Sequence, residues 1–87
     1  MSRYRPAPGV GVEDDGEAVY VAHLPDGPVT VLAGSAGAVW RAACIGPLET
    51  LVPRVAADFG VDPDAVAADV EAAVAAMRAA GLLERVE

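Results

Sequence analysis

Few side chains in this sequence are of the kind that carry out chemistry, and their spacing does not bring them together. The 87 residues include one histidine, His23, and one cysteine, Cys44. A histidine acts as a general base when a nucleophile or an orienting carboxylate lies within hydrogen-bond reach, and local spacing places no such partner beside His23. Cys44 follows Ala42 and Ala43, an environment typical of a buried small hydrophobic residue. We therefore expect no catalytic residues and predict that the protein is not an enzyme.

Metal and cofactor sites are not predicted either. One cysteine and one histidine cannot build a zinc site of the usual Cys/His type. Carboxylates gather at Glu13, Asp14, Asp15 and Glu17, but they lack the alternating ligands and the length of a calcium loop. The favoured interpretation is a solvated hairpin tip, and cation binding is the alternative. No glycine-rich phosphate loop precedes a helix, so we expect no metal and no cofactor.

The charge of the chain argues against nucleic acid as a partner. Six Arg, no Lys and thirteen Asp plus Glu give a formal net charge of −7, whereas binding to phosphates needs a basic surface. No apolar run reaches the roughly 20 residues that a membrane-spanning helix needs, and the first residues lead into no signal-peptide core. A lone cysteine cannot form an internal disulfide. We therefore expect a cytoplasmic protein that contacts neither membranes nor nucleic acid.

The first half of the chain, punctuated by Gly and Pro, predicts an antiparallel meander. After a loose lead-in at residues 1–7, three strands are expected at residues 8–13, 17–24 and 28–32. Turn signals separate them, because Asp-Gly sequences tolerate the backbone conformations of tight turns. In the second strand the alternation places Val19, Val21 and His23 on one face. The whole chain, residues 1–87, is expected to form a single domain.

The second half is rich in Ala and predicts three helices. The first has Ser35 as its N-cap and runs to about Cys44. The second spans roughly residues 48–58, and Pro53 is tolerated there if Thr50 is the N-cap, since the third helical residue has no intrahelical acceptor for an N–H. The third begins at the Asp62 cap, runs to about residue 80, and is followed by a short extended tail at residues 82–86.

These elements predict an α+β fold of the winged helix-turn-helix type, with a three-stranded antiparallel sheet followed by three helices. Trp40, the largest apolar side chain, is expected in the core, and a ligand-binding role is its alternative. A winged-helix regulator that binds DNA is the alternative function. The last helix argues against it, because Asp64, Asp69 and Glu71 outnumber a single arginine there.

The order of these segments resembles the PqqD-like peptide-chaperone family, whose fold is also that of the RiPP recognition elements. The resemblance is carried by Val31-Leu32, Ala38-Val39-Trp40, Leu51-Val52, Phe59-Gly60-Val61 and Gly81-Leu82-Leu83. It implies a non-catalytic protein that binds the leader segment of a ribosomally made precursor peptide by strand addition. It also implies that the leader is presented to a partner, either a leader protease or another modifying enzyme. Among stand-alone members the lasso-peptide type is favoured, and the pyrroloquinoline-quinone type is second.

The resemblance also implies where the leader binds. In the family the leader adds as a strand beside the third strand, in the groove between that strand and the third helix. An edge strand carries unpaired backbone groups that strand addition uses. For Val70 and Met77 a purely structural role in the core is the alternative. The expected peptide-binding residues are Val29, Thr30, Val31, Leu32, Asp69, Val70, Ala73 and Met77.

Overall fold

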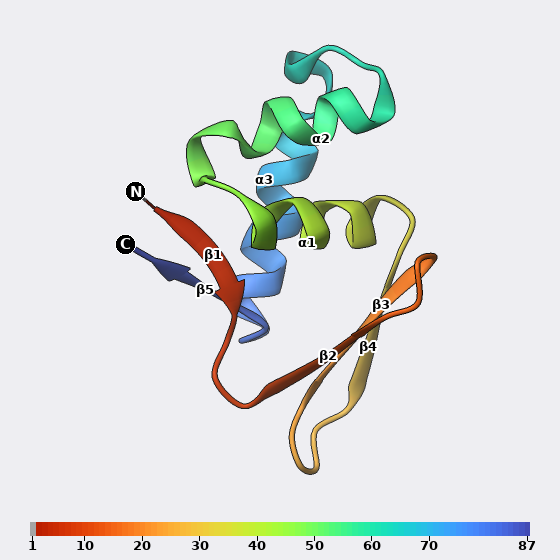
Figure 1. The fold of residues 1–87 in the computed structure, drawn as a ribbon, viewed down its shortest axis with the longest axis vertical. Coiled ribbons are helices and arrows are strands. Elements are labelled where there is room, and N and C mark those ends of the chain that lie inside the picture. The colour runs from red at the N-terminus through yellow and green to blue at the C-terminus, as the bar shows by residue number, and fades with distance from the viewer. Residues whose placement is uncertain (1) are drawn as a thin grey trace.

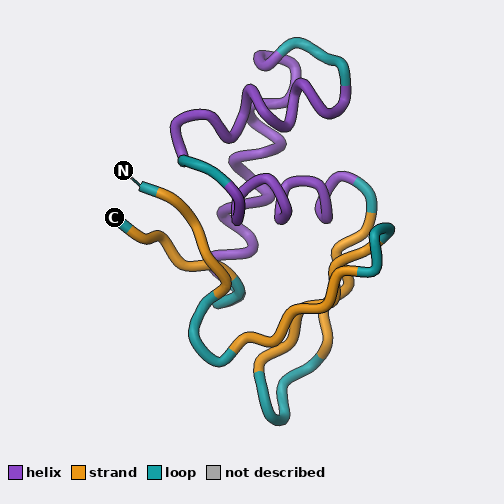
Figure 2. The backbone as a smooth tube through the Cα atoms, viewed as in Figure 1, coloured by secondary structure: helices purple, strands orange, loops and turns teal. Residues whose placement is uncertain are grey.

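The computed structural model describes residues 2–87, and in it α1 lies between a three-stranded sheet and the other helices (Figures 1 and 2). The sheet is followed by three α-helices, so the predicted α+β fold class is confirmed. A second, two-stranded sheet joins the two ends of the described chain. The elements in chain order are β1 (Arg3–Pro6), β2 (Val10–Asp14), β3 (Ala18–His23), β4 (Val29–Ala33), α1 (Ser35–Ile45), the 3₁₀ turn η1 (Leu48–Thr50), α2 (Leu51–Phe59), α3 (Pro63–Ala79) and β5 (Leu83–Val86).

The larger sheet has the strand order β2-β3-β4 with both pairs antiparallel, as the meander prediction requires. Carboxylates close the first hairpin turn. Asp14 accepts a hydrogen bond from the Gly16 N–H at 2.9 Å, and Asp15 accepts from the N–H groups of Glu17 and Ala18, each at 2.8 Å. Aspartate side chains that bond the backbone in this way stabilise tight turns.

The core lies between the inner face of this sheet and the helices. Val19 and Val21 are completely buried on β3, and Trp40 of α1 is only 3% exposed, which confirms that Trp40 is a core residue. Gly37 allows α1 to approach β4 closely, because a Cβ at that position would lie 2.7 Å from the carbonyl oxygen of Leu32. The helix that fills the core is thereby placed directly against β4.

The first residues were expected to be a loose lead-in, and this expectation is wrong. Residues Arg3–Pro6 form β1, which pairs antiparallel with β5 in the register Arg3↔Val86 to Pro6↔Leu83. Tyr4 is 7% exposed and belongs to the core. The partner strand comes from the other end of the chain, after Gly81 with φ 74° turns it back from α3. Local sequence patterns do not contain such a pairing.

The helix boundaries follow the predictions with two corrections. The N-cap of α1 is Gly34, with φ 58°, and the predicted cap Ser35 is the first helical residue. Gly adopts a positive φ at little cost, so the chain turns into the helix one residue earlier than predicted. The second helix was expected from residue 48, but residues 48–50 form η1, and α2 begins after the N-cap Thr50 with Pro53 as its third residue. The Asp62 cap of α3 is confirmed, because its carboxylate accepts a hydrogen bond from the Asp64 N–H.

Arginine 54 fixes the connection between α1 and α2. Its guanidinium donates hydrogen bonds to the carbonyl oxygens of Ala42 and Pro47 and to the hydroxyl of Thr50. A cation at this position satisfies carbonyl groups left free at the end of α1. A Cβ at Gly46 would lie 2.8 Å from the guanidinium carbon, so this glycine makes room for the arginine.

Candidate functional site

Within residues 2–87, the outer edge of β4 pairs with no other strand. Among the strands that the structure describes, β4 pairs with β3 alone. A free edge strand presents backbone N–H and C=O groups to any chain that aligns with it. Which residues supply those groups depends on the hydrogen-bond alternation of the sheet.

Hydrogen bonds at both ends of the β2–β3 pair show which residues of β3 bond to β2 and which bond to β4. The Asp15 N–H donates to the Ala18 carbonyl, and the Leu24 N–H donates to the Gly9 carbonyl. In an antiparallel pair, bonded and non-bonded positions alternate, so Tyr20 and Ala22 direct their backbone groups toward β2. Val19 and Val21 must then bond β4, at their register partners Leu32 and Thr30.

It follows that the backbone groups of Val29, Val31 and Ala33 point outward. These three residues alternate with Thr30 and Leu32, whose backbone groups face β3. The outward groups are spaced as a further antiparallel or parallel strand requires. The structure thus provides a ready backbone template along the whole length of β4.

Side chains on β4 divide between the two faces of the sheet. Leu32 is 7% exposed and faces the core beside Val19, whereas Thr30 lies on the same face but is exposed. Val29 and Val31 point to the opposite face and are 63% and 55% exposed. A strand added at this edge would continue both faces.

A cavity of about 420 Å³ lies where the chain passes from β4 into α1. It is bounded by the first turns of α1, the end of α2 and the first half of α3, and almost all of its lining is apolar. Val39, Val55 and Val70 are buried in its wall, while Phe59 and Val61 are 48% and 42% exposed. The lining residues are Ser35, Ala36, Val39, Val55, Phe59, Val61, Val66, Asp69, Val70 and Ala73.

The predicted site residues are only partly brought together. Asp69, Val70 and Ala73 line the cavity, but Met77 is 5% exposed and lies in the hydrophobic core. None of the four predicted β4 residues, 29–32, lines the cavity. β4 and α3 each pack against α1 and make little contact with each other. α1 therefore separates the edge of β4 from the face of α3.

Sequence reasoning did not assign Phe59 and Val61 to the site. Both flank Gly60, which ends α2 in the left-handed conformation with φ 65°. A helix end of this kind turns the chain sharply and leaves the two apolar side chains half exposed at the cavity. The apolar pair on either side of a helix-ending glycine is the signal in the sequence that identifies them.

The surroundings of the cavity are acidic. No arginine occurs between Arg54 and Arg78, whereas this stretch contains Asp58, Asp62, Asp64, Asp69 and Glu71. Asp69 is exposed and forms no ion pair or side-chain hydrogen bond among residues 2–87. The helix-turn-helix pair α2–α3 thus lacks the positive charge that a DNA-binding helix needs.

Among residues 2–87, the structure gives no sign of catalytic or metal-binding roles for His23 and Cys44, the other candidates from the sequence. The His23 ring nitrogen Nε2 lies 3.1 Å from the carbonyl oxygen of Ala80 at the end of α3. Cys44 is half-buried, and burial raises the pKa of its thiol to about 11, so the reactive thiolate is disfavoured. In the part of the chain that the structure describes, His, Cys, Asp and Glu form no group that could hold a metal ion.

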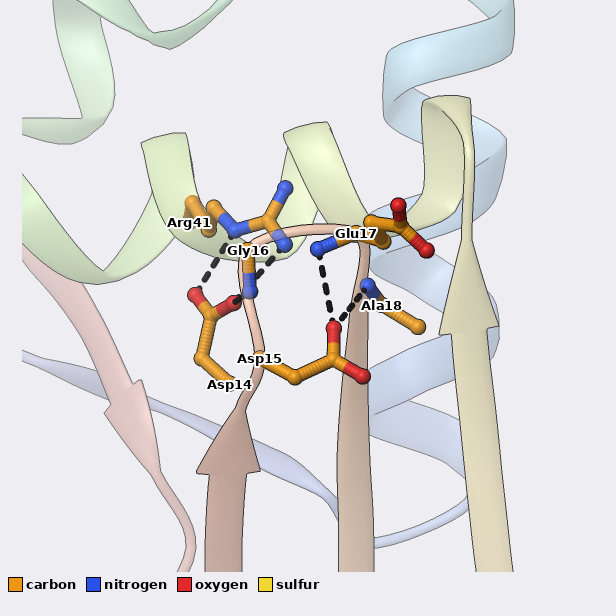
Figure 3. A network of polar contacts seen from close by, with 6 residues as sticks. All are labelled: Asp14, Asp15, Gly16, Glu17, Ala18 and Arg41. Carbon is orange, nitrogen blue, oxygen red and sulfur yellow. Dashed lines mark hydrogen bonds and ion pairs between the residues drawn. The ribbon is translucent and has the colours of Figure 1, made fainter.

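The acidic hairpin tip is tied to α1 (Figure 3). Arg41 donates hydrogen bonds to both carboxylate oxygens of Asp14, at 2.7 and 2.8 Å. These bonds, together with the bond from the Gly16 N–H, hold the pKa of Asp14 at about 2. The carboxylates of Asp14 and Asp15 therefore stabilise the turn, and all four acidic residues of the cluster are exposed at the hairpin tip.

Comparison with known proteins identifies one family. A sequence model described as "Coenzyme PQQ synthesis protein D (PqqD)" matches residues 18–83, which include β3, β4 and all three α-helices. No curated protein and no solved structure matches the chain. Within residues 2–87, no helix is long and apolar enough to span a membrane.

Proposed function

Because the chain belongs to the PqqD family, we propose that it binds the leader of a ribosomally synthesised precursor peptide as an added strand on β4. The family consists of non-catalytic chaperones that bind such precursor peptides and act together with modifying enzymes. The outward backbone groups of Val29, Val31 and Ala33 at the free edge carry the proposal. They supply affinity for an extended chain of any sequence.

Each predicted site residue has a place in this proposal. Val29 and Val31 contribute outward backbone groups, and Thr30 contacts leader side chains on the inner face. Asp69 and Ala73 form the wall that the leader meets where it leaves β4. Leu32, Val70 and Met77 are buried in the hydrophobic core, so their contribution to the site is mainly structural.

We further propose that the partner belongs to a lasso-peptide pathway, in which the bound leader is presented to a leader protease. The pyrroloquinoline-quinone type, with a radical-SAM enzyme as partner, is the second candidate. The genes beside the gene for this protein distinguish the two. A precursor gene with a leader protease and a cyclase supports the first, and a radical-SAM gene without them contradicts it.

Two proline substitutions on adjacent residues test strand addition. Val31→Pro removes an outward N–H and leaves the β3–β4 hydrogen bonds intact, since proline is tolerated on the free side of an edge strand. Thr30→Pro is the matched control, because the Thr30 N–H bonds to β3. We expect a folded Val31→Pro protein that no longer binds, and a Thr30→Pro protein that loses stability.

The measurement uses immobilised protein and a display library of short random peptides, followed by titration of an enriched peptide. Circular dichroism first establishes which variants are folded. Enrichment by the wild type that is lost with folded Val31→Pro supports strand addition. Equal binding by the wild type and Val31→Pro, or no enrichment by the wild type, contradicts the proposal.

A further inference from the structure

We infer that the cavity beside the β4–α1 junction selects leaders in which a large apolar side chain is followed or preceded closely by Lys or Arg. This inference rests on the proposed function, because it concerns the part of the leader that passes beyond the edge of β4. The apolar side chain occupies the cavity, and the cation lies against Asp69. Asp69 is thereby assigned as a specificity-determining residue.

The position of the cavity links it to the β4 edge. Ser35 and Ala36 line it, and only Gly34 separates them from the last residue of β4, Ala33. An added strand that pairs with Val31 and Ala33 and extends past Ala33 toward α1 therefore reaches the cavity within a few residues. Each extended residue advances about 3.3 Å. Figure 1 shows the upper end of β4 leading to the end of α1 that lies nearest the end of α2.

The lining of the cavity favours an apolar occupant. Its volume of about 420 Å³ falls within the range of roughly 300–1,000 Å³ typical of ligand pockets. Phe59 and Val61 leave about half of their surface exposed at its rim. An aromatic or branched side chain placed there would remove this apolar surface from water, which stabilises the complex.

Electrostatics determine the charge beside that side chain. Among residues 2–87, Asp69 is the only charged residue in the lining, and the chain from residue 55 to 77 contains five carboxylates and no arginine. The two arginines that flank this stretch already have partners: Arg54 donates hydrogen bonds to backbone carbonyls, and the Arg78 guanidinium carbon lies 5.7 Å from the centroid of the Tyr4 ring. Arg41 of α1 is bonded to Asp14. Negative charge beside an apolar cavity attracts a cationic segment and repels an acidic one.

The same charges argue against two other occupants. A second copy of this chain would bring its own net charge of −7 against the acidic helices, and like charges at an interface oppose association. Nucleic acid would place phosphates against the same carboxylates. A short cationic and apolar peptide meets neither obstacle.

A display selection tests the inference on the full 87-residue chain. The random-peptide library is selected in parallel on the wild type, on Asp69→Asn and on Glu71→Gln. Glu71→Gln is the matched control, because it neutralises an exposed carboxylate of the same helix that does not line this cavity. We expect the wild type and Glu71→Gln to enrich peptides with Lys or Arg within two positions of a large apolar residue. Asp69→Asn should keep the apolar preference and lose the basic one.

Titration of one enriched peptide then gives the size of the effect. Asp69→Asn should weaken binding about two- to fivefold, which is the range expected for a partly exposed ion pair, and added salt should reduce the difference. Enriched peptides without a basic preference, or the same preference on Asp69→Asn, overturn the inference and leave strand addition intact. If the wild type enriches no peptide, the proposed function fails, and the inference fails with it.

Discussion

Arg41 of α1 holds the carboxylate of Asp14 at the end of β2 through two hydrogen bonds, from Nε at 2.7 Å and from Nη2 at 2.8 Å. The pair joins the tip of the first hairpin to the helix that also packs against β4. Hydrogen bonds between ionised groups in this paired geometry are stronger than neutral ones. The orientation of the sheet relative to the helices depends in part on this contact.

Acid should weaken the contact between pH 4 and pH 2. The pKa of Asp14 is lowered from 3.8 to about 2, chiefly by the Arg41 hydrogen bonds. A group whose pKa is lower in the folded state stabilises the fold above its unfolded pKa, and this stabilisation is lost as pH falls through the folded pKa. We expect NMR titration to show Asp14 titrating near pH 2.

The variant Asp14→Asn should remove this part of the pH dependence of unfolding. Glu17→Gln, in the same turn, is the control, since its carboxylate forms no ion pair within residues 2–87. Urea unfolding of the three proteins at several acidic pH values provides the comparison. A wild-type acid transition that Asp14→Asn leaves unaltered would show that the Arg41 contact contributes nothing measurable.

A carboxylate introduced into the cavity should block binding. Ala73→Glu places a charge in the lining, where an unpaired carboxylate against a bound peptide is costly. Ala72→Glu is the matched control, because Ala72 is an exposed neighbour on the same helix, lies three residues from Asp69 where Ala73 lies four, and does not line the cavity. We expect weaker binding only for Ala73→Glu in calorimetric titrations with a selected peptide. Unchanged affinity in the folded Ala73→Glu protein would show that bound peptides do not reach this wall.

Trp40 should be needed for folding rather than for binding. Removal of a large buried side chain costs roughly 3–5 kcal/mol, and total stability is typically only about 5–15 kcal/mol. With Trp40 3% exposed, we expect Trp40→Ala to be largely unfolded by circular dichroism and Trp40→Phe to be folded but less stable. A well-folded Trp40→Ala protein that merely lost peptide binding would contradict the structural role.

Cys44 should react slowly with alkylating reagents at neutral pH. Burial raises the pKa of its thiol from 9.0 to about 11, and the thiolate is the reactive form. The folded protein keeps this proton at pH values where the unfolded chain loses it, so the folded state loses stability as pH rises from about 9 to about 11. The rate of iodoacetamide labelling, measured against pH for native and urea-unfolded protein, checks both statements. Equal rates at neutral pH would contradict them.

Much of the fold is predictable from short-range patterns. The alternation in β3, the Asp-Gly turn signal and the Asp62 cap each act within a few residues, so the three-stranded sheet and the start of α3 could be placed. The β1–β5 pair could not, because its register joins residues about 80 positions apart. The Gly34 cap was missed because serine is also a preferred cap residue, and the backbone turned one residue sooner.

The candidate site was less predictable than the fold. The free edge of β4 follows from the strand order, but the outward direction of the Val31 amide depends on hydrogen bonds at both ends of the neighbouring hairpin. The cavity depends on how the end of α2 sits above α1, which brings Phe59 and Val61 beside Asp69. Helical periodicity shows which residues share a side of α3 but not which part of that side faces a neighbouring helix.

The β1–β5 ribbon brings the two ends of the described chain together, with the Ser2 hydroxyl 3.5 Å from the Glu87 carboxylate. A short Gly/Ser linker could therefore join the ends covalently, and a cut in the turn between β3 and β4 would give a circularly permuted chain that begins with β4. A leader fused to that new end would be tethered beside β4, its proposed binding edge. Such a tether raises the effective concentration of a weakly bound peptide, so the permuted protein offers a route to an occupied complex.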